Sequence, residues 1–230
     1  MTNQKEEMSD EAYRILCCIN AVIENDHFVY DSGKHGSVYV SHQDIYTNPF
    51  VVSKLAFWLT RYIYPILKNR IDIILTPTNG CIALGQWLAY YLGQLIEEKR
   101  VLVLWAEKSW FKEENKFVLP PMFEKYIINK DVLIVDDIVT SGGSIKDLAR
   151  LVVNRGSRVS AGACLWNRGL VKIENLPLIS LIEKKLDDWN QKECLLCRDG
   201  VLINTDYGHG KEFLKDIASS VNYDHGGESG

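Results

Sequence analysis

Apolar residues recur along the chain in two alternating patterns, one typical of helices and the other of buried strands. Helical spacing predicts a helix opened by Ser9, with a stripe from Ala12 to Ile23, and a helix opened by Asn48 and Pro49. Two more helices are expected after residues 76–80 and 140–144. Short apolar runs predict strands at residues 71–75, 101–105, 132–135, 158–165 and 178–182. This alternation favours an α/β fold, a Rossmann-like parallel sheet flanked by helices.

Two stretches fall outside this alternation. Residues 27–40 read as two short strands around a turn at residues 33–36. Residues 106–130 form a long polar and aromatic connection, in which residues 117–123 suggest a hairpin or a flap. A connection of this length is expected to contain structure or function of its own.

Residues 131–144 combine a buried strand, an acid pair and a loop of small residues. The run 132–135 ends at Asp136 and Asp137, and the loop that follows opens a helix. Backbone amides at a helix N-terminus favour an anion, and adjacent glycines let the backbone approach it. Because the acids would repel that anion, they are better placed to accept hydrogen bonds from vicinal hydroxyls or to hold a divalent cation through water. The alternative is an ordinary strand-to-helix turn with acids for solubility. The predicted anion loop contains Thr140, Ser141, Gly142, Gly143 and Ser144.

This stretch resembles the phosphoribosyl diphosphate (PRPP) motif of the type I phosphoribosyltransferases at every position. The resemblance implies that residues 140–144 bind the 5-phosphate of PRPP and that Asp136 and Asp137 support the ribose during catalysis. It gives Lys108 the role of a catalytic cation on a closing loop. A second strand-to-helix loop, with Thr78, Asn79 and Gly80, would bind the diphosphate together with Mg²⁺, which would also contact Asp136 and Asp137 through water.

Within that family the chain is most similar to orotate phosphoribosyltransferases, which make orotidine 5′-monophosphate in pyrimidine nucleotide biosynthesis. The hairpin of residues 27–40 and the turn after residue 165 carry this resemblance, which assigns the base to Lys34, His35, Tyr39 and Arg168. A planar guanidinium suits the carboxylate of a planar acid. For Arg168 and Lys34, solvated turn residues are the alternatives.

The chain also departs from the orotate pattern. Gly80 and Cys81 stand where many members have Lys and Gly, and Ala106 stands where an Arg is usual. The following loop keeps Glu107 and Lys108, with Lys112 nearby. Two alternatives therefore remain open: a phosphoribosyltransferase for a purine or another base, and a non-catalytic PRPP-binding regulator.

Composition adds limits to this picture. With 47% hydrophobic and 24% charged residues and a net charge of −4, the chain is typical of a globular protein and does not favour nucleic-acid binding. The apolar runs are too short to predict a membrane span. Six Cys without a secretory leader favour reduced thiols and a cytoplasmic location, and the resemblance implies a homodimer.

The expected organisation is a phosphoribosyltransferase domain over residues 1–186, including N-terminal elements of a small hood, and a C-terminal extension over residues 187–230. That extension contains Cys194 and Cys197 in a Cys-x-x-Cys motif, with His209 downstream. These residues are short of the usual four zinc ligands. Thiol packing is therefore the preferred interpretation of the motif, and a zinc site is the alternative.

Overall fold

The computed structural model describes residues 2–78, 80–96, 100–109 and 117–224, and divides the chain into two compact units. Unit 1 consists of Met1–Ile15 and His42–Lys185, and unit 2 of Leu16–Ser41 and Leu186–Gly230. Sequence analysis grouped the residue 27–40 hairpin with residues 1–186, whereas this division groups it with the C-terminal segment. Among the described residues, no helix combines the length and the apolar composition that crossing a membrane requires.

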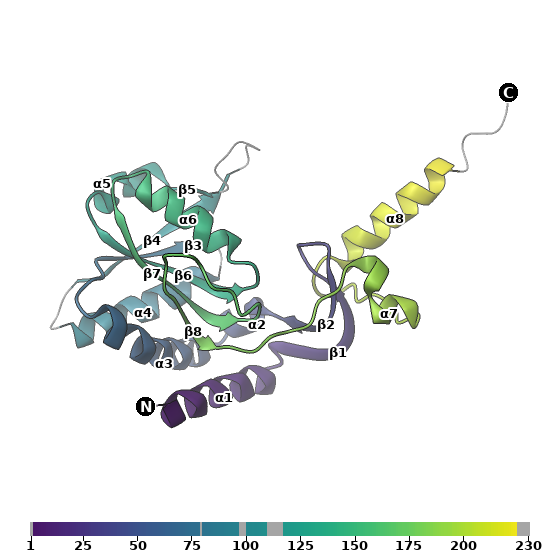
Figure 1. Cartoon of the computed structure of the whole chain (residues 1–230), viewed down its shortest axis with the longest axis horizontal. Helices are drawn as coiled ribbons and strands as arrows, with labels where there is room; N and C mark the ends of the chain where they lie inside the picture. The colour runs from purple at the N-terminus through teal and green to yellow at the C-terminus, as the bar shows by residue number, and fades with distance from the viewer. Residues whose placement is uncertain (1, 79, 97–99, 110–116, 225–230) are drawn as a thin grey trace. The chain divides into compact units, whose positions relative to one another are not determined.

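The sheet of unit 1 contains six strands in the order β5-β4-β3-β6-β7-β8 (Figure 1). Neighbouring strands from β4 to β8 run parallel, and the short edge strand β5 pairs antiparallel with β4. The parallel α/β sheet expected from the sequence is therefore confirmed. Its strands are β3 (Ile73–Pro77), β4 (Leu102–Lys108), β5 (Phe117–Val118), β6 (Asp131–Val139), β7 (Arg158–Asn167) and β8 (Leu178–Ile182).

Helices cover both faces of this sheet, with α3 and α4 on one face and α5 and α6 on the other (Figure 1). The α3 helix begins where the sequence predicts, because the Asn48 side chain accepts a hydrogen bond from the Val51 amide at 3.3 Å and Pro49 follows it. The helices of unit 1 are α1 (Thr2–Cys18), which ends in unit 2, α2 (His42–Tyr46), α3 (Pro49–Leu67), α4 (Cys81–Leu95), α5 (Glu124–Ile127), which follows the 3-10 turn η1 (Pro121–Phe123), and α6 (Gly143–Val153).

The core of unit 1 lies between these layers. Val132 to Val135 have no exposed surface, which explains why β6 reads as an unbroken apolar run rather than an alternating one. On α6, Ile145, Leu148 and Val152 are buried at the helical spacing seen in the sequence. The central strands and the first turn of α6 are therefore fixed by packing on both sides.

Unit 2 is built on the antiparallel hairpin of β1 (Val22–Val29) and β2 (His35–Val40). The C-terminal segment adds the 3-10 turn η2 (Gln191–Glu193), α7 (Leu195–Arg198) and α8 (Gly210–Asp224). The Trp189 and His35 backbones exchange two hydrogen bonds of 2.8 Å, and the Asn204 amide donates to the His27 carbonyl at 2.8 Å. The C-terminal segment is thus bound to the hairpin at both histidine positions.

The first helix differs from its prediction at both ends. It begins at Thr2 rather than after Ser9, and it ends at Cys18, so Val22 and Ile23 lie in β1 instead of on a helical stripe. Asn20 adopts a positive φ of 57° directly after this helix, a conformation that redirects the chain. The apolar residues on either side of it therefore belong to two different elements.

Candidate active site at the carboxyl edge of the sheet

The chemistry-bearing residues predicted in unit 1 follow neighbouring parallel strands. Lys108 ends β4, Thr78 follows β3, the acid pair lies near the carboxyl end of β6, and Arg168 follows β7. The Thr78 amide donates to the Ala106 carbonyl at 2.9 Å, and the Arg168 amide donates to the Val139 carbonyl at 3.0 Å. Carboxyl ends of parallel strands share one edge of a sheet, where α/β proteins place their ligands. The structure therefore brings these positions to one edge.

Asp136 is the most perturbed acid at this edge. Its side chain is 9% exposed, and its Oδ1 accepts hydrogen bonds from the Asp137 amide at 3.0 Å and from the Cys81 thiol at 3.5 Å. Burial, and then the negative charge of Asp137, raise the pKa of Asp136 to about 7. Asp137 is half-buried, and its Oδ1 accepts from the Ile138 amide at 2.7 Å. At neutral pH, Asp136 can thus accept a hydrogen bond or donate one.

The loop after β6 has the backbone geometry of an anion cradle. Thr140 and Ser141 are exposed, and Gly142 takes a φ of 75° directly before α6. Gly169 lies in the turn after β7, and a Cβ at this position would overlap the Thr140 carbonyl. Because glycine has no Cβ, the backbone of this turn can contact the backbone of the loop after β6. The first amides of α6 have no acceptor within the helix and lie at its positive end. Gly143 and Ser144, both half-buried, occupy these first positions.

The loop after β3 also leads into a helix N-terminus, where Gly80 precedes α4. Thr78 and Gly80 are half-buried, and Asn79 lies outside the described residues. A Cβ on Gly80 would overlap the Tyr46 ring, so this glycine permits close packing of α2 on the loop. Cys81 is the first residue of α4.

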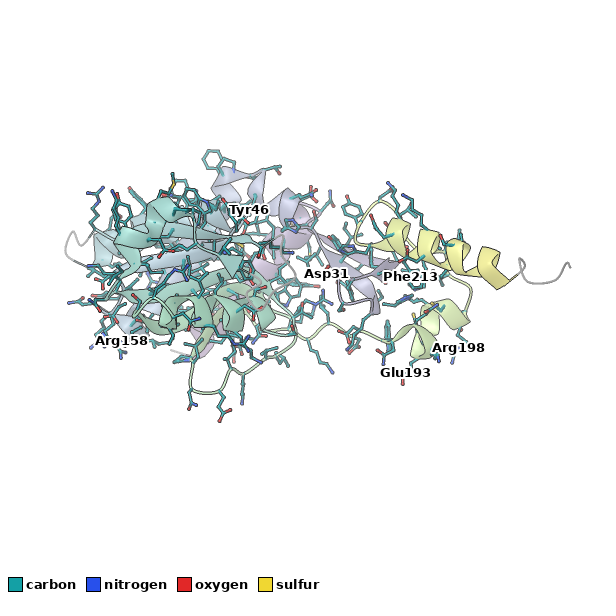
Figure 2. The ribbon with its side chains drawn as sticks, turned by 90° about the horizontal axis from the view of Figure 1, so that it is seen from above. Asp31, Tyr46, Arg158, Glu193, Arg198 and Phe213 are labelled. Atoms are coloured by element: carbon teal, nitrogen blue, oxygen red, sulfur yellow. The ribbon has the colours of Figure 1, made fainter. Side chains whose placement is uncertain are left out.

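Tyr46 and Cys81 are two members of this site that sequence reasoning missed as functional residues. The Tyr46 hydroxyl is buried beside the Cys81 thiol, a weak hydrogen-bonding group, and burial followed by the charge of Asp137 raises the pKa of Tyr46. Burial and the same charge raise the pKa of Cys81. The sequence did contain a signal for Cys81, because it stands where many orotate enzymes have Gly. Nothing in the sequence of α2 indicates that Tyr46 belongs to the site. Figure 2 shows Tyr46 and Arg158, the first residue of β7, toward opposite ends of unit 1.

The two basic residues predicted for this edge differ in exposure. Lys108 is exposed and pairs in register with Phe117 of β5, while Lys112 lies outside the described residues. Arg168 is 7% exposed, so it is not the solvated turn residue that the alternative interpretation required. The preceding residue, Asn167, closes the turn by bonding the Val171 amide and carbonyl at 2.9 Å and 3.0 Å.

The residues predicted to contact a base from the N-terminal hairpin lie in unit 2. Lys34 Nζ pairs with Asp188 Oδ1 at 2.7 Å, and the Tyr39 ring packs against Phe28 and Tyr207. His35 is fully buried, so its side chain has no surface with which to contact a base in this conformation. Its neighbours are instead His27 and Cys197.

Comparisons with known proteins agree with this geometry. Residues 41–192 match the family model described as phosphoribosyl transferase domain. The chain is 31% identical over 184 residues to an orotate phosphoribosyltransferase of Caldanaerobacter subterraneus, covering 78% of this chain and 87% of that protein. It is 29% identical over 170 residues to an orotate phosphoribosyltransferase of Bartonella henselae, covering 73% and 80%.

Solved structures show the same fold. The orotate phosphoribosyltransferase of Aeropyrum pernix matches with a TM-score of 0.57 and 20% identity, over 74% of this chain and 92% of that one. An adenine phosphoribosyltransferase of Saccharomyces cerevisiae matches with a TM-score of 0.57 and 21% identity, over 75% and 99%. Unit 1 therefore has an architecture that is also found in phosphoribosyltransferases named for two different bases, orotate and adenine.

Proposed function

Because the chain belongs to the phosphoribosyl transferase domain family, we propose that it transfers the phosphoribosyl group of PRPP to orotate. The products would be orotidine 5′-monophosphate and diphosphate. The observation that carries the proposal is the end of β6, where an acid pair with one buried member, Asp136, leads through a positive-φ glycine into a helix N-terminus. The names of the curated relatives support orotate as the acceptor.

Each part of the site suits one part of PRPP. The amides and hydroxyls of residues 140–144 would bind the 5-phosphate, and Thr78 and Gly80, with Asn79 between them, would bind the diphosphate. The acid pair would hold the ribose hydroxyls, because Asp136, whose pKa is raised to about 7, can donate a hydrogen bond while the Asp137 carboxyl accepts one. Lys108, exposed at the end of β4, would approach the diphosphate from solvent.

The reaction demands electrostatics more than covalent chemistry from these side chains. Breaking the bond between C1 of ribose and the diphosphate oxygen places positive charge on the ring and negative charge on the leaving group. A ring nitrogen of the base then forms the new bond to C1. Asp136 and Asp137 would stabilise the cationic ring, and the amides at the two helix N-termini would hold the phosphates on either side in place.

The acid pair fits a role in magnesium binding. The Asp136 and Asp137 carboxylates and the Cys81 thiol offer ligand atoms within 4.8 Å of one another, and Mg²⁺ selects the oxygens. Since Mg²⁺ retains several waters, the half-buried Asp137 is suited to hold it through water. When bound, the ion would neutralise charge on the diphosphate, a task made larger here because Gly80 and Cys81 replace the Lys and Gly of many orotate enzymes.

Arg168 is the residue of unit 1 proposed to recognise orotate. It follows β7 beside the end of β6, and a planar guanidinium can bind a carboxylate through two parallel hydrogen bonds. The roles of Lys34 and Tyr39 toward the base, a homodimeric assembly and a cytoplasmic location stay predictions from the resemblance.

The proposal is tested by incubating the full chain with Mg²⁺ and PRPP and following diphosphate release with orotate, adenine, hypoxanthine or uracil in separate reactions. We expect release with orotate alone. Diphosphate release with a purine but not with orotate would show that the protein is a phosphoribosyltransferase with a purine acceptor. PRPP binding without diphosphate release in the presence of any of the bases would indicate a regulator.

Matched variants assign the chemistry to the acid pair. The Asp136→Asn, Asp137→Asn double variant is expected to lose turnover by orders of magnitude while its circular dichroism spectrum stays unchanged. Asp147→Asn removes a carboxylate that pairs with Arg150 on the surface of α6, and serves as the charge control. Near-normal turnover in the double variant would refute the proposed roles of both acids.

A further inference from the structure

Four potential metal ligands meet in unit 2, outside the candidate active site. We call His27, His35, Cys194 and Cys197 the His–Cys cluster; one ligand atom from each lies within 4.8 Å of the others. His27 and His35 have no exposed surface, Cys194 is 2% exposed and Cys197 is half-buried. The histidine that follows the Cys-x-x-Cys motif in the sequence, His209, is not part of this cluster, and both of its histidines come from the hairpin.

The hairpin presents the two histidines on one face. His35 of β2 is paired with Val29 of β1, and His27 lies two residues before Val29. The pairing of β1 with β2 is irregular between Glu24 and Phe28, the stretch that contains His27, and its side chain meets that of His35 beside this irregularity. The His27 Nε2 and His35 Nδ1 atoms are 2.9 Å apart.

The C-terminal segment brings the two cysteines to the same point. Cys194 immediately precedes α7 and Cys197 lies within it, so one turn of helix places both sulfurs on one side. The Cys194 Sγ atom is 3.5 Å from His27 Nε2, and the Cys197 Sγ atom is 3.7 Å from His27 Nε2 and 3.3 Å from His35 Nδ1. Arg198 and Phe213, neighbours of the cluster on α7 and α8, are labelled in Figure 2.

The nitrogen–sulfur separations fit tetrahedral coordination of zinc, and the two nitrogens lie closer together than in such a site. With zinc–nitrogen bonds of ~2.0 Å and zinc–sulfur bonds of ~2.3 Å, a tetrahedron places two nitrogens about 3.3 Å apart and a nitrogen and a sulfur about 3.5 Å apart. The observed nitrogen–sulfur distances of 3.3–3.7 Å bracket the second value. The observed nitrogen–nitrogen distance of 2.9 Å is shorter than the first value, so the two imidazoles would move apart by about 0.4 Å when zinc binds. Two nitrogens and two thiolates form a donor set that selects Zn²⁺ over magnesium or calcium.

A supporting contact orients the first histidine toward the centre of the cluster. His27 Nδ1 lies 2.8 Å from the Val201 carbonyl, which can only accept a hydrogen bond, so Nδ1 carries the proton. His27 Nε2 is then unprotonated and presents its lone pair to the cluster. Backbone carbonyls hold metal-binding histidines in this way in many zinc sites. Phe213 covers the outer side of His35 with ring centroids 4.9 Å apart.

We propose that His27 Nε2, His35 Nδ1, Cys194 Sγ and Cys197 Sγ bind one Zn²⁺ ion, which fastens the C-terminal segment to the β1–β2 hairpin. Four protein ligands leave no open coordination position, so the ion is structural. It joins residues that are 167 positions apart in the chain, in a unit whose sheet has only two strands in the described residues. Two-stranded hairpins are marginally stable alone, and a structural metal is a common means of stabilising such small units.

The test measures metal content in the untagged full-length protein, expressed with zinc and dialysed under reducing conditions. We expect one zinc per chain by elemental mass spectrometry. Replacing the zinc with Co²⁺ should give the intense visible absorption of a tetrahedral site and a thiolate-to-cobalt charge-transfer band. Zinc below about 0.2 per chain, or a Cys194–Cys197 disulfide in the reduced preparation, would overturn the proposal.

Variants locate the ion. Cys197→Ser is nearly isosteric at a half-buried position and should lower the zinc content at least fivefold, as should His27→Ala. Cys18→Ser, at an exposed cysteine of the same unit, is the matched control and should keep full zinc. Equal zinc in Cys197→Ser and Cys18→Ser would refute the assignment. If Cys197→Ser fails to fold, the cobalt spectrum of the wild-type protein decides the question alone.

A second readout reports the structural role. Removing zinc with a chelator should speed proteolytic cleavage between residues 186 and 209 at least tenfold, and adding zinc back should reverse this. Unchanged cleavage with zinc removed would show that the ion does not fasten the segment. Neither result depends on transferase activity, so failure of the zinc proposal and failure of the proposed reaction are distinguishable.

Discussion

The buried Asp136 carboxyl should make the stability of the ligand-free protein depend on pH, and Asp136→Asn should remove that dependence. The pKa of Asp136 is raised from 3.8 to about 7, mainly by burial. Between these values the folded protein holds a proton that the unfolded chain has lost, so stability falls as pH rises from about 4 to about 7 and is level above that. The window spans roughly three pH units at ~1.4 kcal/mol each, which sets an upper limit of ~4 kcal/mol.

The asparagine cannot ionise, and its Oδ1 can still accept from the Asp137 amide. We therefore expect the stability difference between Asp136→Asn and wild type to grow by roughly 2–3 kcal/mol from pH 5 to pH 8. Urea denaturation of both proteins at pH 5, 6, 7 and 8, without PRPP, measures this difference. A difference that stays constant over this range would refute the reasoning.

Asp137→Asn is the matched control for this measurement. It removes the second cause of the Asp136 pKa shift and leaves the first, which is burial. The variant should therefore keep a pH dependence that ends at a lower pH and has a smaller total than that of wild type. A pH dependence that extends to the same pH as in wild type would show that the two carboxyls do not interact.

Three further predictions concern the same edge of the sheet. Gly142→Ala should lower the free energy of unfolding by about 1–2 kcal/mol and raise the KM for PRPP, because φ is 75° and the new methyl would lie 3.1 Å from Val171; denaturation and kinetics test this. Arg168→Lys should raise the KM for orotate about tenfold, ~1.4 kcal/mol, and change that for PRPP less than twofold, since Lys cannot form the paired hydrogen bonds. Tyr46→Phe should stabilise the free protein by about 1 kcal/mol, seen as a higher Tm, because it removes a buried hydroxyl that the Cys81 thiol satisfies only weakly.

Local patterns were sufficient to predict most of unit 1. The unbroken apolar run of β6 predicts a strand covered on both faces, and the order of Asn48 and Pro49 predicts the start of α3, because both signals are contained within a few residues. The sequence also places the acid pair at a strand end. It does not place Tyr46 against Gly80, since that contact joins two elements through packing alone.

Long-range pairing explains what the sequence left undetermined. The antiparallel edge strand β5 is only two residues long. A strand this short shows no periodic pattern, so the sequence suggested only a hairpin or a flap in this stretch. In unit 2, His35 lay in a turn that resembles a base-contacting segment, yet its neighbours come from residues 189 and 197. No local spacing links a histidine to a cysteine motif that follows more than 150 residues later in the chain.

The division of unit 2 into two separate segments has a consequence for its synthesis on the ribosome. The hairpin histidines emerge early, and the cysteines emerge only after residues 42–185 have been made. At 5–20 residues per second, the histidines wait on the order of 10 s for their partners. During that interval unit 1 can complete its sheet, whereas the hairpin has only its own two strands. In a chain truncated before Cys194, the hairpin would therefore remain without its C-terminal partner segment, a state that is only temporary during synthesis of the full chain.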